Sequence, residues 1–174
     1  AIPTFTWLDG CSNGEQSIEE LVEVGRSTGV AAFNIIPDRN YTPGQKNQKL
    51  ENLNQVVKLT QDLGLPLLGG TEMNSPGQKF VDDFSSAELA PHHNLFLRGS
   101  WILHAHSTLQ RYAGMGYLSD RAKDQFSGVE SKNDFYASFG ESFSPRGDRI
   151  LQDSLNAEMG AGEVSELAAQ AMSA

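Results

Sequence analysis

Strand-like and helix-like segments alternate over the first 126 residues of this chain. Segments rich in aromatic, β-branched or leucine residues lie at 3–9, 30–36, 65–72 and 100–106. Each is followed by a helical pattern, at about 17–29, 46–63, 78–97 and from 107 onward. Strands that alternate with helices form right-handed βαβ crossovers, so we expect an α/β fold with a parallel sheet in chain order.

Helix boundaries are indicated by capping residues and glycines. Ser17 with Glu20, and Ser107 with Gln110, have the spacing of a capping box, and Gly29 is expected to end the first helix. From residue 127 the strand pattern disappears and the sequence predicts helices. We therefore expect a βα-repeat domain over residues 1–126 and a helical C-terminal extension over 127–174.

Four βα units are fewer than a closed barrel requires, since such a barrel has about eight strands and roughly 250 residues. The sequence leaves two alternatives: an open α/β sheet, or a partial or distorted TIM-like barrel whose other part is missing or supplied by another chain. An exposed edge strand invites pairing. We therefore expect a homodimer, or a chain that is part of a longer polypeptide.

Composition limits the classes of binding partner that the chain can have. The net charge of −9 argues against nucleic acid, because binding to phosphates requires a basic surface. No apolar run approaches the ~20 residues of a membrane span, so no membrane partner is expected. Cys11 is the single cysteine and forms no internal disulfide. The sequence does not determine the cellular compartment, and we favour the cytoplasm.

Potential functional residues gather where the predicted strands end. In parallel α/β folds, ligands bind at the carboxyl ends of the strands. The polar residues at these ends are Asp9, Asp38, Asn40, Glu72, Asn74, His104 and His106. Aspartate and asparagine also suit turns for backbone reasons alone, which is the alternative explanation for Asp9 and Asp38.

Carboxylate and imidazole groups together suit a divalent metal such as zinc, manganese or iron. His104 and His106 are two residues apart, so on a strand they would face the same side, as a chelating pair must. We expect Glu72, His104 and His106 to bind the metal, and Asp38 and Asp9 to be the catalytic residues, with Asp38 as the base.

A small polar substrate would need hydrogen-bond donors and positive charge near these acids. The segment "NSPGQK" at 74–79 places a turn before a predicted helix start, where backbone N–H groups favour anions. The expected substrate-binding residues are Arg39, Asn40, Asn74, Lys79 and Arg111.

Three segments, at 12–40, 63–74 and 103–107, resemble the polymerase and histidinol phosphatase (PHP) family of metal-dependent hydrolases. In residues 12–40, Ser12, Asn13 and Gly14 stand at the family's Ser-Asp-Gly turn, and 17–22 match the opening of its first helix. "LGLPLLGGTEMN" at 63–74 resembles the family's Gly-x-Glu segment, whose metal-binding glutamate would be Glu72. "LHAHS" at 103–107 is similar to its next histidine-bearing strand. The resemblance covers about 110 residues and implies a PHP-like barrel.

Departures from the family are also present. The family's His-x-His pair falls on Thr6 and Leu8, and its Thr-Asp-His segment is replaced by "IPDRN". Asp9 and Asp38 are the available substitutes for the missing ligands, and further ligands could come from an absent part of the chain.

The leading expectation is therefore a metal-dependent, phosphoesterase-like hydrolase that acts on a small polar substrate. One alternative is a metal-using sugar isomerase or aldolase-type barrel, which would need the same acids and histidines. The other is a catalytically silent PHP-like domain that binds a ligand or a partner, which the missing family histidines favour.

Overall fold

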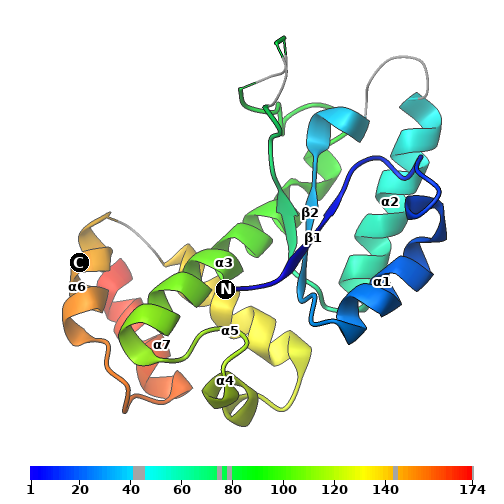
Figure 1. Cartoon of the computed structure of the whole chain (residues 1–174). Helices are drawn as coiled ribbons and strands as arrows, with labels where there is room; N and C mark the ends of the chain where they lie inside the picture. The colour runs from blue at the N-terminus through cyan, green and yellow to red at the C-terminus, as the bar shows by residue number, and fades with distance from the viewer. Residues whose placement is uncertain (41–45, 74–75, 78–79, 143–144, 174) are drawn as a thin grey trace. The chain divides into compact units, whose positions relative to one another are not determined.

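The chain forms two compact units (Figure 1). The computed structural model describes residues 1–40, 46–73, 76–77, 80–142 and 145–173. Residues 3–97 make up the first unit, called the α/β unit below, and residues 1–2 with 98–174 make up the helical unit. Among the described residues, no helix has the length and hydrophobicity that crossing a membrane requires.

The α/β unit is built on three short parallel strands. Its elements are β1 (Thr4–Trp7), η1 (Glu15–Ser17), α1 (Ile18–Ser27), β2 (Ala32–Ile35), η2 (Pro37–Asn40), α2 (Lys46–Asp62), β3 (Leu67–Gly69), η3 (Ala90–His92) and the first turn of α3 (His93–Ala113). The strands pair in the order β1-β2-β3, with Thr4 opposite Ala32 and Phe33 opposite Leu67. The predicted parallel sheet in chain order is confirmed for these three strands.

Helices α1 and α2 pack on the sheet and bury one apolar stripe each (Figure 1). The shared core comprises Trp7, Phe33, Ile35 and Leu67 from the sheet, Ile18 and Val22 from α1, Leu53, Val56 and Val57 from α2, and Leu89 and Phe96. Burying each large side chain contributes about 1.5–3 kcal/mol. Gly29 and Gly64 follow the two helices with φ of +98° and +64°, values that favour glycine. Gly29 ends its helix as predicted, and Gly64 ends α2 in the same way.

The helical unit has a separate core. It contains the rest of α3, followed by α4 (Asp120–Gln125), α5 (Val129–Glu141), α6 (Pro145–Ser154) and α7 (Ala161–Met172). Its largest fully buried side chains are Ile102, Leu109, Met115, Tyr136, Leu151 and Val164. Helices α3 and α5 approach closely, because a Cβ on Gly140 would lie 2.0 Å from the carbonyl oxygen of Trp101.

The fourth predicted strand is wrong. Residues 100–106 lie inside α3, whose buried positions Ile102, Ala105, Leu109 and Ala113 recur every three or four residues, as on one face of a helix. The helix predicted at 78–97 is also wrong over its first part, because η3 begins only at Ala90. The described residues form one three-stranded sheet, which does not support a TIM-like barrel.

Both predicted capping boxes are wrong as well. Ser17 stands at the N-cap of α1, but its side chain accepts no capping hydrogen bond from the described residues. Ser107 lies within α3, where its hydroxyl donates to the carbonyl oxygen of Leu103 at 3.0 Å. The capping arrangement near the first helix instead uses Ser12, which accepts a hydrogen bond from the Glu15 backbone N–H at 3.3 Å.

Candidate functional site

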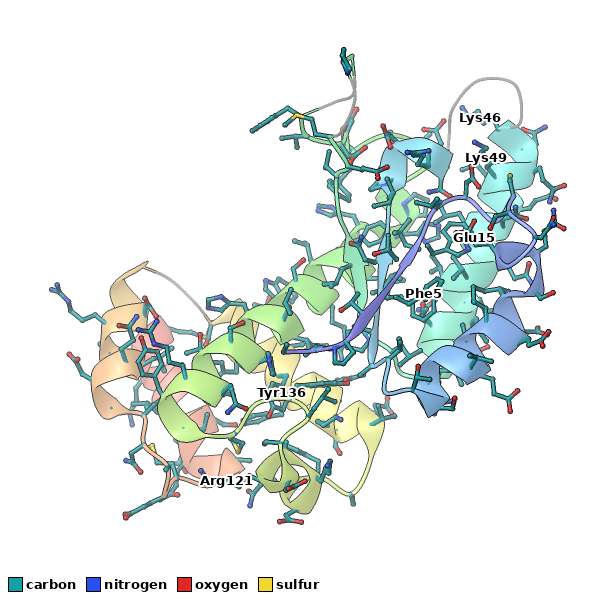
Figure 2. The ribbon with its side chains drawn as sticks, in the orientation of Figure 1. Phe5, Glu15, Lys46, Lys49, Arg121 and Tyr136 are labelled. Carbon is teal, nitrogen blue, oxygen red and sulfur yellow. The ribbon has the colours of Figure 1, made fainter. Side chains whose placement is uncertain are left out.

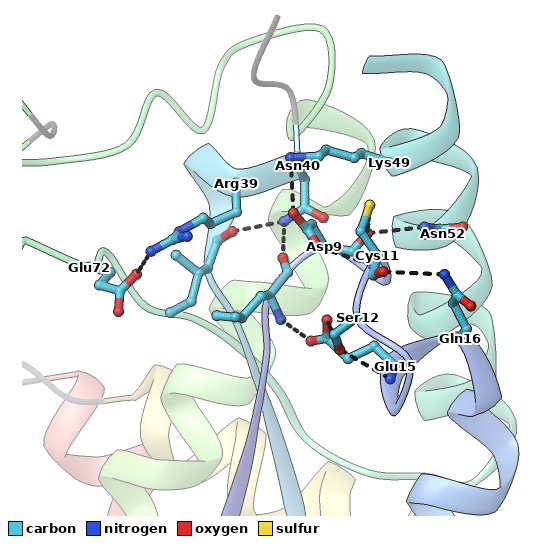
Figure 3. Close-up of polar contacts among 12 residues, drawn as sticks. Asp9, Cys11, Ser12, Glu15, Gln16, Arg39, Asn40, Lys49, Asn52 and Glu72 are labelled. Atoms are coloured by element: carbon cyan, nitrogen blue, oxygen red, sulfur yellow. Dashed lines mark hydrogen bonds and ion pairs between the residues drawn. The ribbon is translucent and has the colours of Figure 1, made fainter. Parts of the chain in front are cut away.

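The carboxyl ends of β1 and β2 are tied together by Asn40. This side chain is fully buried, and its Nδ2 donates to the carbonyl oxygens of Leu8 at 3.0 Å and Ile36 at 2.8 Å (Figure 3). Asn40 was predicted to bind substrate. Its observed contacts are those of a residue that fixes the backbone beneath the site.

Asp9 forms an ion pair at the same edge. Its Oδ2 lies 2.9 Å from Nζ of Lys49, and its Oδ1 accepts the backbone N–H of Cys11 at 3.0 Å (Figure 3). Burial acts to raise the pKa of Asp9, but the hydrogen bonds from Lys49 and Cys11 outweigh it and lower the pKa. Asp9 therefore holds Lys49 as an ionised carboxylate near neutral pH.

The backbone around Asp9 is fixed from α2. Nδ2 of Asn52 donates to the Asp9 carbonyl oxygen at 3.0 Å. Gly10 allows this approach, because its φ is +74° and an added Cβ would lie 2.6 Å from Nδ2 of Asn52. The loop after β1 and the first turns of α2 are therefore held against each other.

Glu15 is a buried acid that sequence reasoning missed. Only 7% of the residue is exposed. Its Oε1 accepts the backbone N–H of Leu8 at 2.6 Å, and its Oε2 accepts the hydroxyl of Ser12 at 3.0 Å. The Ser-x-x-Glu spacing at 12–15 was the available signal. Glu15 thus connects the end of β1 to the start of the first helical turn.

Glu72, a predicted metal ligand, pairs with Arg39, a predicted substrate-binding residue. Oε2 of Glu72 lies 2.6 Å from a guanidinium nitrogen of Arg39 (Figure 3). The hydrogen bond and charge of Glu72 raise the pKa of Arg39, and the charges of Asp38 and Asp9 act in the same direction. Three of the predicted acids thus act on one arginine of the chain itself.

An open pocket of about 1110 Å³ lies beside this edge. It is called the α2 pocket below and is lined by Trp7, Gly10, Cys11, Glu15, Gln16, Ile18, Lys46, Asn47, Gln48, Glu51, Asn52 and Gln55. Figure 2 shows Glu15, Lys46 and Lys49 at this end of the unit. Most small-molecule pockets are lined mainly by apolar side chains, whereas this lining is mainly amide and charged.

The predicted histidine pair is wrong, because both residues lie on α3. Two residues along an α-helix correspond to a rotation of about 200°, so His104 and His106 point to opposite sides. Nδ1 of His106 accepts the backbone N–H of Tyr117 at 3.0 Å, and burial lowers the pKa of His106. His106 therefore stabilises the turn after α3 within the helical unit.

The remaining predicted residues either do not line the α2 pocket or lie outside the described residues. Arg111, on α3, has its guanidinium carbon 5.2 Å from the centre of the Tyr112 ring. Asn74 and Lys79 lie outside the described residues. Asp38 follows β2 in η2, at the carboxyl end of the sheet where it was predicted.

The metal ligands expected from the sequence are not assembled in the described part of the chain. There, no group of three or more histidine, cysteine, aspartate or glutamate side chains is placed to hold a metal ion. The acids Asp9 and Glu72 contact Lys49 and Arg39 instead. A metal bound by Asp9 or Glu72 would compete with these basic side chains for the carboxylate.

Comparisons of the chain with protein-family models, with curated proteins and with solved structures found no match. Function is therefore inferred from the geometry of the α/β unit.

Proposed function

We propose that the α/β unit is a binding unit, and that it takes a small polar molecule in the α2 pocket. The observation that carries this proposal is the open, polar pocket beside the carboxyl end of the sheet. Ligands of parallel α/β folds bind at this end of the sheet. The hydrogen bonds of Asn52 and Glu15 fix the walls around it, which reduces the ordering that binding requires.

Part of the pocket wall is free to contact a ligand. Asn47, Glu51 and Gln55 are four residues apart on α2, so they form a row along one side of the helix. Their side chains make no hydrogen bond to other described residues, and all three are exposed. This row is the part of the wall we expect a ligand to contact.

Binding without catalysis is favoured because the acids at the site already have partners. Asp9 pairs with Lys49, Glu72 pairs with Arg39, and both carboxylate oxygens of Glu15 accept hydrogen bonds. Burial, together with the charge of Asp9, raises the pKa of the Cys11 thiol, which disfavours the nucleophilic thiolate. These groups are better suited to holding the backbone in place than to transferring protons or acting as nucleophiles.

The test is a titration of the full chain, by calorimetry and amide NMR, with neutral sugars, amino acids, polyamines and phosphate esters added one at a time. We expect one class to bind and to shift amide signals at 47–55. Gln55→Ala should weaken that binding about two- to tenfold, the loss expected for one hydrogen bond. Gln61→Ala is the matched control, because Gln61 is an exposed glutamine nearer the C-terminal end of α2, and this change should leave the affinity unchanged. The absence of binding by all four classes would overturn the proposal.

The metal-dependent, phosphoesterase-like hydrolase of the PHP-like type is the second candidate. It is supported by the closeness of Asp9, Asp38 and Glu72, three acids near the guanidinium of Arg39 at the carboxyl end of the sheet. Elemental analysis after mild purification tests it: stoichiometric zinc, manganese or iron, lost in Glu72→Gln, would favour it over binding alone. A substrate panel would then separate a hydrolase from the sugar isomerase or aldolase alternative.

A further inference from the structure

We infer that the ligand of the α2 pocket is a neutral molecule with several hydroxyl groups, a sugar or a polyol. This inference rests on the proposed binding function and specifies the chemical class of the ligand. It is carried by two features of the pocket: its amide-rich lining and its paired basic side chains.

The lining is rich in groups that both donate and accept hydrogen bonds. Five side-chain amides contribute, from both sides of the pocket: Gln16, Asn47, Gln48, Asn52 and Gln55. A hydroxyl group also donates and accepts, so an amide can form a pair of opposite hydrogen bonds with neighbouring hydroxyls. Gln16, Gln48 and Asn52 already use a side-chain N–H within the chain. Asn47 and Gln55, which make no side-chain hydrogen bond to other described residues, are the amides expected to pair in this way. The row from Asn47 to Gln55 extends about 12 Å along the helix, enough for a ligand with several such groups.

The basic side chains near the pocket disfavour an anionic ligand. Lys46 forms an ion pair with Glu88, and Lys49 forms one with Asp9. Glu51 has no such partner among the described residues, and a phosphate or carboxylate placed beside it would be repelled. A hydroxyl can instead donate to Glu51, and hydrogen bonds to a charged group are the stronger kind.

Trp7 provides an indole signal that can report on binding. Trp7 lines the pocket and is 1% exposed, and its Nε1–H is buried with no acceptor in the described part of the chain. Because Nε1 is buried, a ligand in the pocket should shift the indole N–H signal by changing the surroundings of the Trp7 ring, without a direct hydrogen bond to Nε1.

The test is an NMR titration of the full chain, following the two indole N–H signals, of Trp7 and Trp101. The probes are glucose, mannose, ribose, myo-inositol, spermidine and inorganic phosphate. We expect at least one sugar or inositol to bind and to shift the Trp7 signal while the Trp101 signal stays in place. Glu51→Gln should weaken that binding at least about threefold, and Gln61→Ala should leave it unchanged.

Two results would overturn the inference. The first is binding of spermidine or phosphate at residues 47–55 without binding of any sugar or inositol, in which case the proposed binding function would stand. The second is sugar binding that leaves the Trp7 signal and the Glu51→Gln affinity unchanged. If none of these probes binds, and no neutral sugar, amino acid, polyamine or phosphate ester of the first titration binds either, the proposed function fails together with the inference.

Discussion

Individual side chains at the carboxyl end of the sheet are used to hold backbone segments in place. Asn40 donates to two carbonyl groups, and Glu15 accepts from a backbone N–H and from Ser12. Lys49 neutralises Asp9. A site built in this way has fixed walls before any ligand arrives, which is the property that the binding proposal requires.

Asn40→Ala should destabilise the α/β unit by about 1–3 kcal/mol. The change leaves the carbonyl oxygens of Leu8 and Ile36 without this donor in a buried place. Urea unfolding measures the loss. Asn47→Ala, an exposed asparagine of the same unit, is the control and should change the free energy of unfolding by less than about 0.5 kcal/mol. Equal losses for the two variants would contradict the role given to Asn40.

His106 should make the stability of the helical unit depend on pH. Its neutral Nδ1 accepts from Tyr117, and burial lowers its pKa below the usual 6.5. The unfolded chain therefore binds a proton first as the pH falls. The contribution of His106 to the free energy of unfolding should be fully present above pH 6.5. It should be lost as the pH falls through the lower pKa of the folded state.

Unfolding of the helical unit between pH 8 and pH 5 measures this dependence. His106→Asn keeps an acceptor and removes the titration, so it should flatten the profile over this range. A wild-type profile with the same shape as that of the variant would show that His106 does not titrate in this way.

At the scale of helices and strands, the sequence predicted element boundaries best where a glycine ends a helix. Gly29 and Gly64 end α1 and α2, and the first three strands follow as expected. Residues 100–106 were misread because so short a segment, with four apolar residues of seven, fits a strand and a helix equally well. The helical spacing from Ile102 to Ala113 becomes clear only over a longer window.

The places of three acids at the edge of the sheet were predictable, but the α2 pocket and the partners of these acids were not. Asp9, Asp38 and Glu72 lie where strand ends were expected to place them. Their partners could not be read from the chain, because Lys49 is 40 residues from Asp9 and Arg39 is 33 residues from Glu72. A carboxylate looks the same in sequence whether a metal or a lysine will neutralise it.

Gly140→Ala should separate α3 from α5 and cost more than about 2 kcal/mol. The added Cβ would meet backbone atoms of Trp101, which cannot rotate away as a side chain can. Gly162→Ala on α7 is the matched control. Nothing lies within 4 Å of a Cβ there, so this change should be neutral or stabilise the helix by up to about 1 kcal/mol. Thermal unfolding followed by circular dichroism compares the two, and equal melting temperatures would argue against close α3–α5 packing.

At the scale of the whole molecule, each unit has its own hydrophobic core, and the α2 pocket belongs to the α/β unit alone. The chain carries a net charge of −9, yet Asp9 and Glu72 at the sheet's edge are paired with basic residues. The acids at this edge are therefore neutralised by basic partners, although the chain as a whole has an excess of acidic residues. The expectation of a dimer or a longer polypeptide stays a prediction, which light scattering at increasing concentration tests.

The central claim is that a polar ligand binds the α2 pocket through the chain's own side chains. The most direct measurement is an amide NMR titration of the full chain with the sugar and polyol panel in excess EDTA, repeated with added zinc or manganese. We predict the same shifts at Asn47, Glu51 and Gln55 in both conditions. Shifts that occur only with the metal, and that are lost in Glu72→Gln, would contradict the account and favour the metal-dependent hydrolase.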